Sequence, residues 1–436
     1  MDFWLILSIL DWVLFIPILL TVMYFTVFSI ASLFSNHPHI PASKRQNRFI
    51  VFIPSYRSDA TILPTVRAIL GQTYPQRLFD VVVISDHQNE MTNFHLAQYP
   101  ITLLTPNFDH SSKSNSLIYA VNNLPQFKIY DVAVVLDADN AVLPEFLSQL
   151  NDAYETSGTK AIQVHRVCKD RNTPSIALGA IFEEINNSVF RRGHITLGLS
   201  SALSGSGMAL DFEWFKKNIV VTRGKCEDKE LEALLLRDSI YIDYFDSILV
   251  FYENNFSTKS LNFQQDRWNK SQFRTILHNL RFVPFAIINK KYNFIDKVIQ
   301  WLLTPRTLMM TVILLMSIIL PFIYFSMAVK WWILASFICF IFALATPDYL
   351  IDQNWNKMML QTPRVFLTSI YRYIHSVWLK KHLKSVKFDT IQIVDYGTPK
   401  YTLGKGILFD DEIKTRDAWG ENAYDVDNIL GVLKTL

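Results

Sequence analysis

The segment from Phe3 to Phe34 is apolar almost throughout, and Asp11 is the only charged residue inside it. About 20 apolar residues are enough for a helix to cross the hydrocarbon core of a bilayer. The segment therefore predicts a membrane span, which we place at Trp12–Leu33. A cleaved signal peptide is the alternative, but the apolar stretch has neither a basic region before it nor a small-residue cleavage site after it. An uncleaved anchor at residues 1–46 is the expectation.

Basic residues follow the first span closely: Lys44, Arg45 and Arg48. By the positive-inside rule, the N-terminus then lies outside and the polar middle of the chain lies in the cytosol. Two further apolar stretches, Thr307–Val329 and Trp331–Thr346, meet at Lys330 and predict a membrane hairpin. Together the three crossings predict a multi-pass protein of the cytoplasmic (inner) membrane, in contact with its lipids, with a cytosolic central domain.

Two segments mix aromatic and basic residues without being apolar enough to span: Arg281–Leu303 and Arg364–Lys381. Such a composition suits helices that lie in the membrane interface, although a helix packed on the soluble domain is an equal alternative for the second. The expected organisation is an anchor (1–46), a cytosolic domain (47–280), an interfacial helix with the hairpin (281–350), and an amphipathic segment with a cytosolic tail (351–436). The acidic residues of that tail fit no motif.

Composition excludes several classes of protein. The chain has 436 residues, half of them hydrophobic, and a net charge of +3, which predicts no nucleic-acid partner. Its three cysteines, Cys168, Cys226 and Cys339, lie in no Cys-x-x-Cys or Cys/His spacing, so neither a disulfide framework nor a structural zinc site is expected.

The central domain alternates between apolar strands and helical segments. Strands are expected at Phe49–Ile53, Val81–Ile84, Ile101–Leu104, Val132–Leu136, Ile240–Ile242 and Ile248–Phe251, and helices at Ala60–Leu70, Lys113–Asn123, Pro144–Tyr154, Ser175–Phe190 and Lys229–Leu236. Such βαβ alternation predicts an α/β, Rossmann-like domain with a mostly parallel sheet covered by helices.

Polar residues recur where the expected strands end. Tyr56 to Asp59 follow the first strand, Ser85-Asp86 the second, and Asp137-Ala138-Asp139 the fourth. Because the carboxyl ends of parallel strands meet at one crevice, these side chains should lie close together. Asp86 could accept hydrogen bonds from a nucleotide base, Asp139 could bind a divalent cation, and Lys113 could balance phosphate charge. Alternatively, the aspartates only bind their own turn backbone.

Four motifs carry a resemblance to a known family. They are Ile53-Pro54-Ser55-Tyr56-Arg57-Ser58-Asp59, Asp137-Ala138-Asp139 with Pro144 after it, Cys226-Glu227-Asp228, and Gln264-Gln265-Asp266-Arg267-Trp268. In order and spacing, they resemble the nucleotide-contact, metal, Thr-Glu-Asp and Gln-x-x-Arg-Trp motifs of the membrane-bound family 2 glycosyltransferases, which include cellulose, hyaluronan and poly-N-acetylglucosamine synthases. The resemblance covers roughly Arg48 to Leu280 and implies a GT-A fold.

It also implies an enzyme that transfers a sugar from a nucleoside diphosphate, with a preference for uridine and with inversion. By resemblance, Asp228 is the general base and Mg²⁺ or Mn²⁺ binds at Asp137 and Asp139. The implied donor contacts are Pro54, Tyr56, Asp59, Asp86, Lys113, Asp137, Asp139 and Arg267. The implied acceptor contacts are Gly205, Ser206, Glu227, Gln264 and Trp268.

Purely structural roles are alternatives for several of these residues. Glu227 and Asp228 also suit the start of a helix, where carboxylates stabilise the dipole. Trp268 also suits a membrane interface, and Gly205-Ser206-Gly207 also suits a turn without a ligand. The chain departs from the family pattern at Ser85, where an aspartate is usual, at Arg57, where asparagine is common, near Ile118, where the usual asparagine is missing, and at Cys226, which replaces threonine.

Three functions remain open on the sequence alone. A processive synthase would extend a polysaccharide and export it, with extra helices from a homo-oligomer or an export partner, because three crossings give few helices to line a path. A non-processive enzyme would add one sugar to a lipid-linked acceptor. A catalytically silent membrane scaffold is the third reading, against which the retained Asp137, Asp139, Asp228, Arg267 and Trp268 argue.

Overall fold

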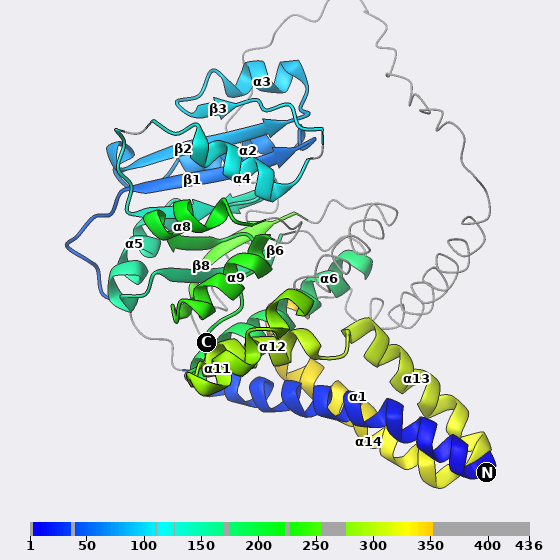
Figure 1. The fold of residues 1–436 in the computed structure, drawn as a ribbon. Coiled ribbons are helices and arrows are strands. Elements are labelled where there is room, and N and C mark those ends of the chain that lie inside the picture. The colour runs from blue at the N-terminus through cyan, green and yellow to red at the C-terminus, as the bar shows by residue number, and fades with distance from the viewer. Residues whose placement is uncertain are drawn as a thin grey trace, which may run out of the picture.

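The structure is a computed structural model that describes residues 3–35, 40–109, 111–125, 127–169, 174–222, 227–253 and 276–351. Two parts are visible in Figure 1: a sheet covered by helices, and a group of long helices, α1 (Phe3–Leu33), α13 (Arg306–Ile323) and α14 (Phe325–Ala345), which project away from it. The expected α/β class is confirmed.

The described residues form one eight-stranded sheet with the order β3-β2-β1-β4-β7-β6-β8-β5. Its strands are β1 (Phe49–Tyr56), β2 (Phe79–Asp86), β3 (Thr102–Leu104), β4 (Val132–Val135), β5 (Asn140–Val142), β6 (Ala161–Cys168), β7 (Met208–Asp211) and β8 (Ile242–Tyr252). Strands β1, β2, β3 and β4 are parallel to one another, and β8 is parallel to β6. Strand β7 is antiparallel to its two neighbours, β4 and β6, and β5 is antiparallel to β8. The sheet is therefore mostly parallel, as predicted.

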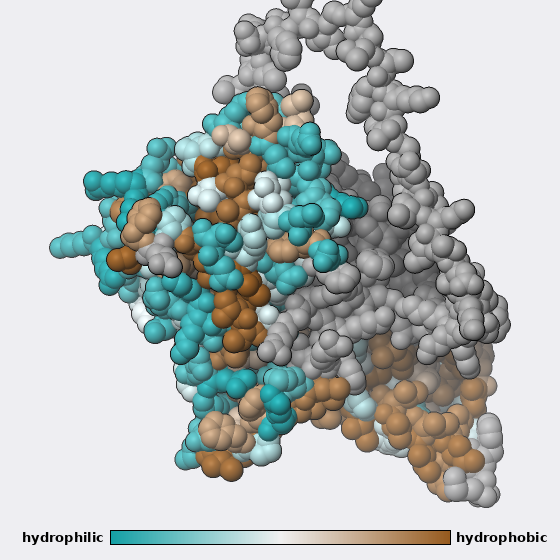
Figure 2. Space-filling view, turned by 45° about the horizontal axis from the view of Figure 1, so that its top comes forward, coloured by the Kyte–Doolittle hydropathy of each residue, from teal (hydrophilic) through white to brown (hydrophobic). Residues whose placement is uncertain are grey.

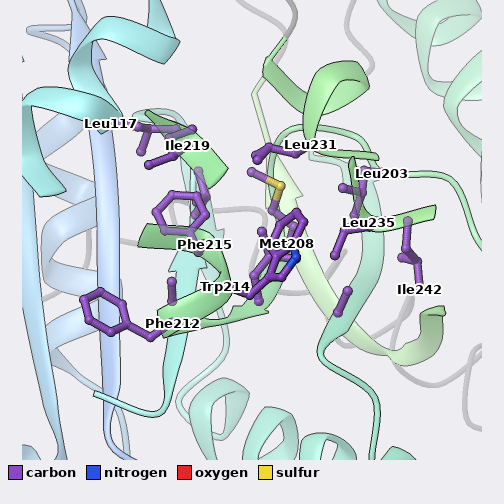
Figure 3. Close-up of a cluster of buried hydrophobic side chains, with 14 of the residues drawn as sticks. Leu117, Leu203, Met208, Phe212, Trp214, Phe215, Ile219, Leu231, Leu235 and Ile242 are labelled. Atoms are coloured by element: carbon purple, nitrogen blue, oxygen red, sulfur yellow. The ribbon is translucent and has the colours of Figure 1, made fainter. Parts of the chain in front are cut away.

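Helices cover both faces of the sheet. On one face lie α2 (Ile62–Leu70), α3 (Glu90–Leu96) and α5 (Phe146–Ser157), and on the other α4 (Lys113–Asn122), α8 (Phe212–Ile219) and α9 (Glu227–Arg237). Figure 3 shows the second face, where Phe215, Trp214 and Leu235 pack around Met208 of β7. A sheet buried on both faces needs apolar residues at successive positions, and all four residues of β4 are buried.

Among the strands of the sheet and the helices that cover it, five were not predicted: α3, β5, β6, β7 and α8. In addition, the two short strands expected at Ile240–Ile242 and Ile248–Phe251 are one strand, β8, because β6 pairs with it along its whole length apart from one register shift. Asp243 and Asp246 interrupt the apolar pattern of β8 without ending the strand. Asp211 marks the start of α8 by accepting a hydrogen bond from the Trp214 amide at 2.9 Å.

The helix expected at Ser175–Phe190 changes geometry along its length. Residues Pro174–Ile185 form α6, and a π-helical segment, η2 (Asn186–Arg192), leads into α7 (Gly193–Thr196). Gly193 lies so close to α1 that an added Cβ would be 2.2 Å from the Phe28 carbonyl oxygen. Ser188 and Ser32 are joined by a hydroxyl hydrogen bond of 2.7 Å. Helix α1 is thereby fixed directly to the α/β part.

The predicted junction of the hairpin at Lys330 is wrong. The two helices separate at Tyr324, which is extended (φ −153°, ψ 100°), and Lys330 lies inside α14. Pro321 has no N–H to donate to the Ser317 carbonyl, and Trp332 of α14 donates its indole N–H to that oxygen at 3.0 Å instead.

Lys330 has a partner within the helices. It forms an ion pair with Asp11 of α1, which is 4 % exposed and also accepts a hydrogen bond from the Trp331 indole at 2.8 Å. The Lys330 ammonium lies 3.9 Å from the centre of the Trp12 ring. These contacts join α1 to α14 in the middle of an apolar surface.

Two described helices are long and apolar enough to cross a membrane, by length and composition alone: Trp4–Leu33 and Phe325–Ala345. A shorter apolar helix spans Leu308–Ile323. Figure 2 shows hydrophobic residues concentrated on this part of the molecule, while the visible face of the α/β part is mixed, with hydrophilic residues on both sides of a hydrophobic stripe. Placement in a membrane stays a prediction.

The segment expected as one interfacial helix, Arg281–Leu303, contains two helices, α11 (Val283–Ile288) and α12 (Tyr292–Leu302). Helix α12 packs on α9 through Lys297, which is 1 % exposed and lies 3.1 Å from the carboxylate of buried Glu232. The second amphipathic segment, Arg364–Lys381, and the tail lie outside the described residues.

Candidate active site

The predicted site residues at the ends of β1, β2 and β4 come together at one edge of the sheet. Strand β1 lies between β2 and β4, and the three are parallel, so Tyr56, Asp86 and Asp137 leave the sheet on the same side. Asp137 and Asp139 occupy the turn between β4 and β5. The strand-end rule therefore located this cluster correctly from the sequence.

Lys113 connects three parts of the cluster. Its ammonium, at the first turn of α4, donates to Asp137 Oδ1 at 2.5 Å and to the Gly205 carbonyl at 2.7 Å, and lies 3.7 Å from Glu227 Oε1. Burial works to lower the pKa of Lys113, but the carboxylates of Asp137 and Glu227 outweigh it and raise that pKa. Lys113 is therefore held as a cation between segments far apart in the sequence.

The two aspartates of the turn have opposite electrostatic surroundings. Burial raises the pKa of Asp139 to about 6, and the neighbouring Asp137 charge adds to the effect. Burial also opposes ionisation of Asp137, but Lys113 and Arg166 hold its pKa below the usual value. Asp137 is thus neutralised by protein cations, whereas Asp139 is the carboxylate that an added cation would stabilise most.

The loop around Gly205, rich in serine and glycine, lies beside Asp228, the residue expected to be the general base. Gly205 has φ +74°, and an added Cβ there would lie 3.5 Å from Cβ of Asp228. Asp228 and Glu227 begin α9, as the sequence predicted for a helix start near Lys229. Burial, together with the Asp228 charge, raises the pKa of Glu227 to about 7. The structure thus brings Glu227, Asp228, Gly205 and Lys113 together.

The ends of β1 and β2 contribute the outer part of the cluster. Tyr56 is half exposed, Pro54 lies within β1 beside Ile84, and Asp59 accepts a hydrogen bond from the Asn89 amide at 2.8 Å. Asp86 is 1 % exposed, and its Oδ2 has no hydrogen-bond partner among the described residues. A buried carboxylate oxygen without a donor is costly, so this atom is suited to accept a hydrogen bond from a ligand.

Two residues of the cluster were missed from the sequence. Asn140 accepts a hydrogen bond from the Asp137 amide at 3.0 Å, donates to Asp139 Oδ1 at 3.0 Å and is also hydrogen-bonded to Ser206. Arg166 of β6 lies 3.9 Å from Asp137. The position of Asn140 directly after Asp139 was an available signal, whereas nothing in the sequence around Arg166 links it to the turn.

Four of the predicted motif residues lie outside the described part of the chain. They are Cys226, Gln264, Arg267 and Trp268. The roles expected for the last three therefore stay predictions.

Comparison with family models decides the class of protein. The model "Glycosyltransferase like family 2" matches residues 46–268, a little more than half of the chain. The chain belongs to this glycosyltransferase family. The resemblance to family 2 glycosyltransferases drawn from the four motifs is confirmed, its membrane-bound part stays a prediction, and the protein is an enzyme that transfers sugar residues. A comparison with curated protein sequences gave no match.

Comparison with solved structures gave matches that include two proteins at low identity. The mannosyltransferase PcManGT from Pyrobaculum calidifontis, solved with GDP-Man and Mn²⁺, is 12 % identical with a TM-score of 0.48, over 75 % of this chain and 96 % of that one. S. aureus TarS with UDP-GlcNAc is 15 % identical with a TM-score of 0.37, over 48 % of this chain and 59 % of that one. A further TarS structure gives 14 % and 0.40, over 53 % and 40 %.

The carboxylate oxygens of the glycosyltransferase's turn between β4 and β5 suit a hard divalent cation that is also bound by a substrate. No cluster of three or more His, Cys, Asp or Glu side chains suited to a metal occurs within the described ranges. Mg²⁺ and Mn²⁺ sites in phosphate-transfer enzymes, however, need only one or two carboxylates, because substrate phosphates supply the other oxygens. Asp139, with Asp137 beside it, meets that requirement.

Proposed function

We propose that the glycosyltransferase moves a sugar from a nucleoside diphosphate, with uridine as the preferred base, onto a glycan or lipid-linked acceptor at the cytoplasmic membrane. An acceptor hydroxyl attacks the anomeric carbon, and the nucleoside diphosphate leaves from the opposite face, so that the configuration inverts. The proposed domain boundaries are those predicted from the sequence. They are an anchor (1–46), a cytosolic catalytic domain (47–280), the interfacial helices with the hairpin (281–350), and an amphipathic segment with the cytosolic tail (351–436).

Asp228 is the proposed general base. The attacking hydroxyl must lose its proton, and a carboxylate within hydrogen-bond reach accepts it. The contact between Asp228 and the Gly205 loop supports this role, because the absence of a side chain at Gly205 leaves space beside the carboxylate for an acceptor. Glu227, Ser206, Gln264 and Trp268 complete the proposed acceptor site.

Asp139, supported by Asp137, is the proposed site for Mg²⁺ or Mn²⁺. When bound, such an ion neutralises charge on the diphosphate as it leaves. Lys113 adds a fixed positive charge on the same side, and Arg267 is proposed for the same task. Asp86, with its unpartnered oxygen, is proposed to bind the base, and Pro54, Tyr56 and Asp59 to line that part of the site.

The observation that carries the proposal is the position of Lys113. Its ammonium contacts Asp137 in the turn between β4 and β5 (the metal turn), the carbonyl of Gly205, and Glu227 at the start of α9. Asp137 and Glu227 belong to two of the family motifs and lie 90 positions apart in the chain, yet both meet the same ammonium. A catalytically silent scaffold would have no need of that convergence.

The deciding experiment is nucleoside diphosphate release by the detergent-solubilised protein with Mg²⁺ or Mn²⁺ and a panel of nucleotide sugars. We expect release with one donor, and a loss of about 10²- to 10⁴-fold in Asp228→Asn, as for other general bases. Glu213→Gln is the matched control, since Glu213 is an exposed carboxylate in the first turn of neighbouring α8. Equal rates in Asp228→Asn and the wild type would refute the assignment of the base.

Product length separates the two acceptor classes. Helix α12 rests on the base-bearing helix α9 through the Lys297–Glu232 pair, so the base lies near the proposed membrane interface. That location suits both a polymer that enters the membrane and a lipid-linked acceptor. A ladder of products on a defined primer would identify a processive enzyme, and a single addition would identify a non-processive one.

A further inference from the structure

Arg166 is a partly buried cation beside the metal turn that the proposed mechanism has not used. It lies on β6, its side chain is 16 % exposed, and its guanidinium sits 4.7 Å from the centre of the Tyr252 ring. Tyr252 pairs with Asn140 where β5 and β8 meet, and Asn140 directly follows Asp139 in the chain. The ring therefore holds the guanidinium against the turn that carries both aspartates.

The two carboxylates nearest to Arg166 already have closer cations. Asp137 is bound by Lys113 at 2.5 Å, and Glu183 by Arg191 at 3.0 Å. Arg166 lies 3.9 Å from the first and 3.8 Å from the second, which is beyond hydrogen-bond length. It is therefore an additional positive charge between two pairs that are already neutralised.

One atom of Arg166 also lacks a partner. Nε is buried and has no hydrogen-bond partner among the described residues. A buried donor without an acceptor costs free energy, and guanidinium groups bind phosphate oxygens with two donors at once. A partly buried surplus cation with a buried, unused donor, next to a turn suited to a metal and a diphosphate, has the properties of a phosphate ligand.

We propose that Arg166 binds the diphosphate of the nucleotide donor, from the side of the metal turn opposite to Lys113. Lys113 faces Oδ1 of Asp137 and Arg166 faces Oδ2. Glu183 and Tyr252 position the guanidinium. The inference rests on the proposed function, because it requires a nucleoside diphosphate at this site.

The test is the binding of UDP and of GDP, each compared with the matching nucleoside, to the full-length protein in detergent with Mn²⁺. For the diphosphate that the wild type binds, Arg166→Met should weaken affinity about 10- to 100-fold, the range for a lost charged hydrogen bond. Affinity for the nucleoside should stay within about threefold. Arg166→Lys, which keeps the charge, should recover part of the loss and guards against a folding defect in Arg166→Met.

Arg192→Met is the matched control. Arg192 is a partly buried arginine of the same region, 3.2 Å from Asp246, and within the described residues it does not contact Asp137 or Asp139. Unchanged diphosphate affinity in folded Arg166→Met and Arg166→Lys, or an equal loss in Arg192→Met, would overturn the inference. A changed Mn²⁺ requirement with unchanged UDP or GDP affinity would also overturn it, because Arg166 would then only position Asp137. A wild type that binds neither diphosphate would overturn the proposed function itself.

Discussion

Replacing Gly193 with alanine tests how closely α1 is joined to the α/β part. Gly193 has helical backbone angles (φ −60°, ψ −36°), so local propensity alone favours alanine by about 1 kcal/mol. The new Cβ, however, would lie 2.2 Å from the Phe28 carbonyl oxygen and 3.1 Å from that of Ser188. Both atoms belong to helix backbones, which cannot move aside as a side chain would.

Overpacking of this kind costs about 1–3 kcal/mol, and the contact at Gly193 is at the severe end. After subtraction of the gain in propensity, we expect Gly193→Ala to be destabilised by about 2 kcal/mol. For a domain of this size that lowers the thermal midpoint by roughly 4–8 °C. Circular dichroism of the detergent-solubilised protein measures it, with Gly71→Ala as the control, because its Cβ would be 3.3 Å from the nearest atom. A midpoint for Gly193→Ala at or above that of the wild type would refute the close contact.

Three more predictions concern charged groups. Asp11→Asn should cost about 3–5 kcal/mol by leaving Lys330 buried without its counter-ion, and adding Lys330→Met should recover most of the loss in a thermal melt; equal stability of Asp11→Asn and the wild type would contradict the pairing. Glu183 has a pKa lowered to about 2 by Arg191 and Arg166 against the effect of burial, so its contribution is full above about pH 4.5 and is lost as the pH falls towards 2; the stability gap between the wild type and Glu183→Gln should shrink over that window, and a constant gap would argue against it. Because the pKa of Asp139 is near 6 and a metal competes with the proton, the concentration of Mn²⁺ needed for half-maximal activity should rise about tenfold per pH unit below pH 6, and chelation of the metal should abolish activity; a requirement independent of pH would exclude Asp139 as the ligand.

The residues of the site that directly follow a clearly apolar strand could be predicted from the sequence. Asp137 and Asp139 follow an unbroken apolar strand, and Asp86 follows another, so one rule of sheet topology was enough to predict their convergence. Arg166 could not be found in this way. It lies within β6, a strand missed altogether, and its role follows from the pairing of β8 with both β6 and β5.

The membrane hairpin shows a different source of error. A lone charge in an apolar run was interpreted as the point where two helices meet, but Lys330 is neutralised by Asp11, some 320 positions away along the chain. Proline was the better local signal, since Pro321 precedes the actual break at Tyr324 by three residues. Charges inside apolar segments are therefore informative about partners in the fold, and less so about boundaries.

The Asp11–Lys330 pair also has a consequence for the order in which the protein is made. In the proposed membrane topology, α1 enters the bilayer first, and α14 is synthesised only after the whole α/β part. During that interval Asp11 has neither the Lys330 ammonium nor the Trp331 indole, and an isolated carboxylate in hydrocarbon is costly. Until its partner arrives, α1 must lie shifted towards the interface or be shielded by insertion machinery, so correct topology is completed late in synthesis.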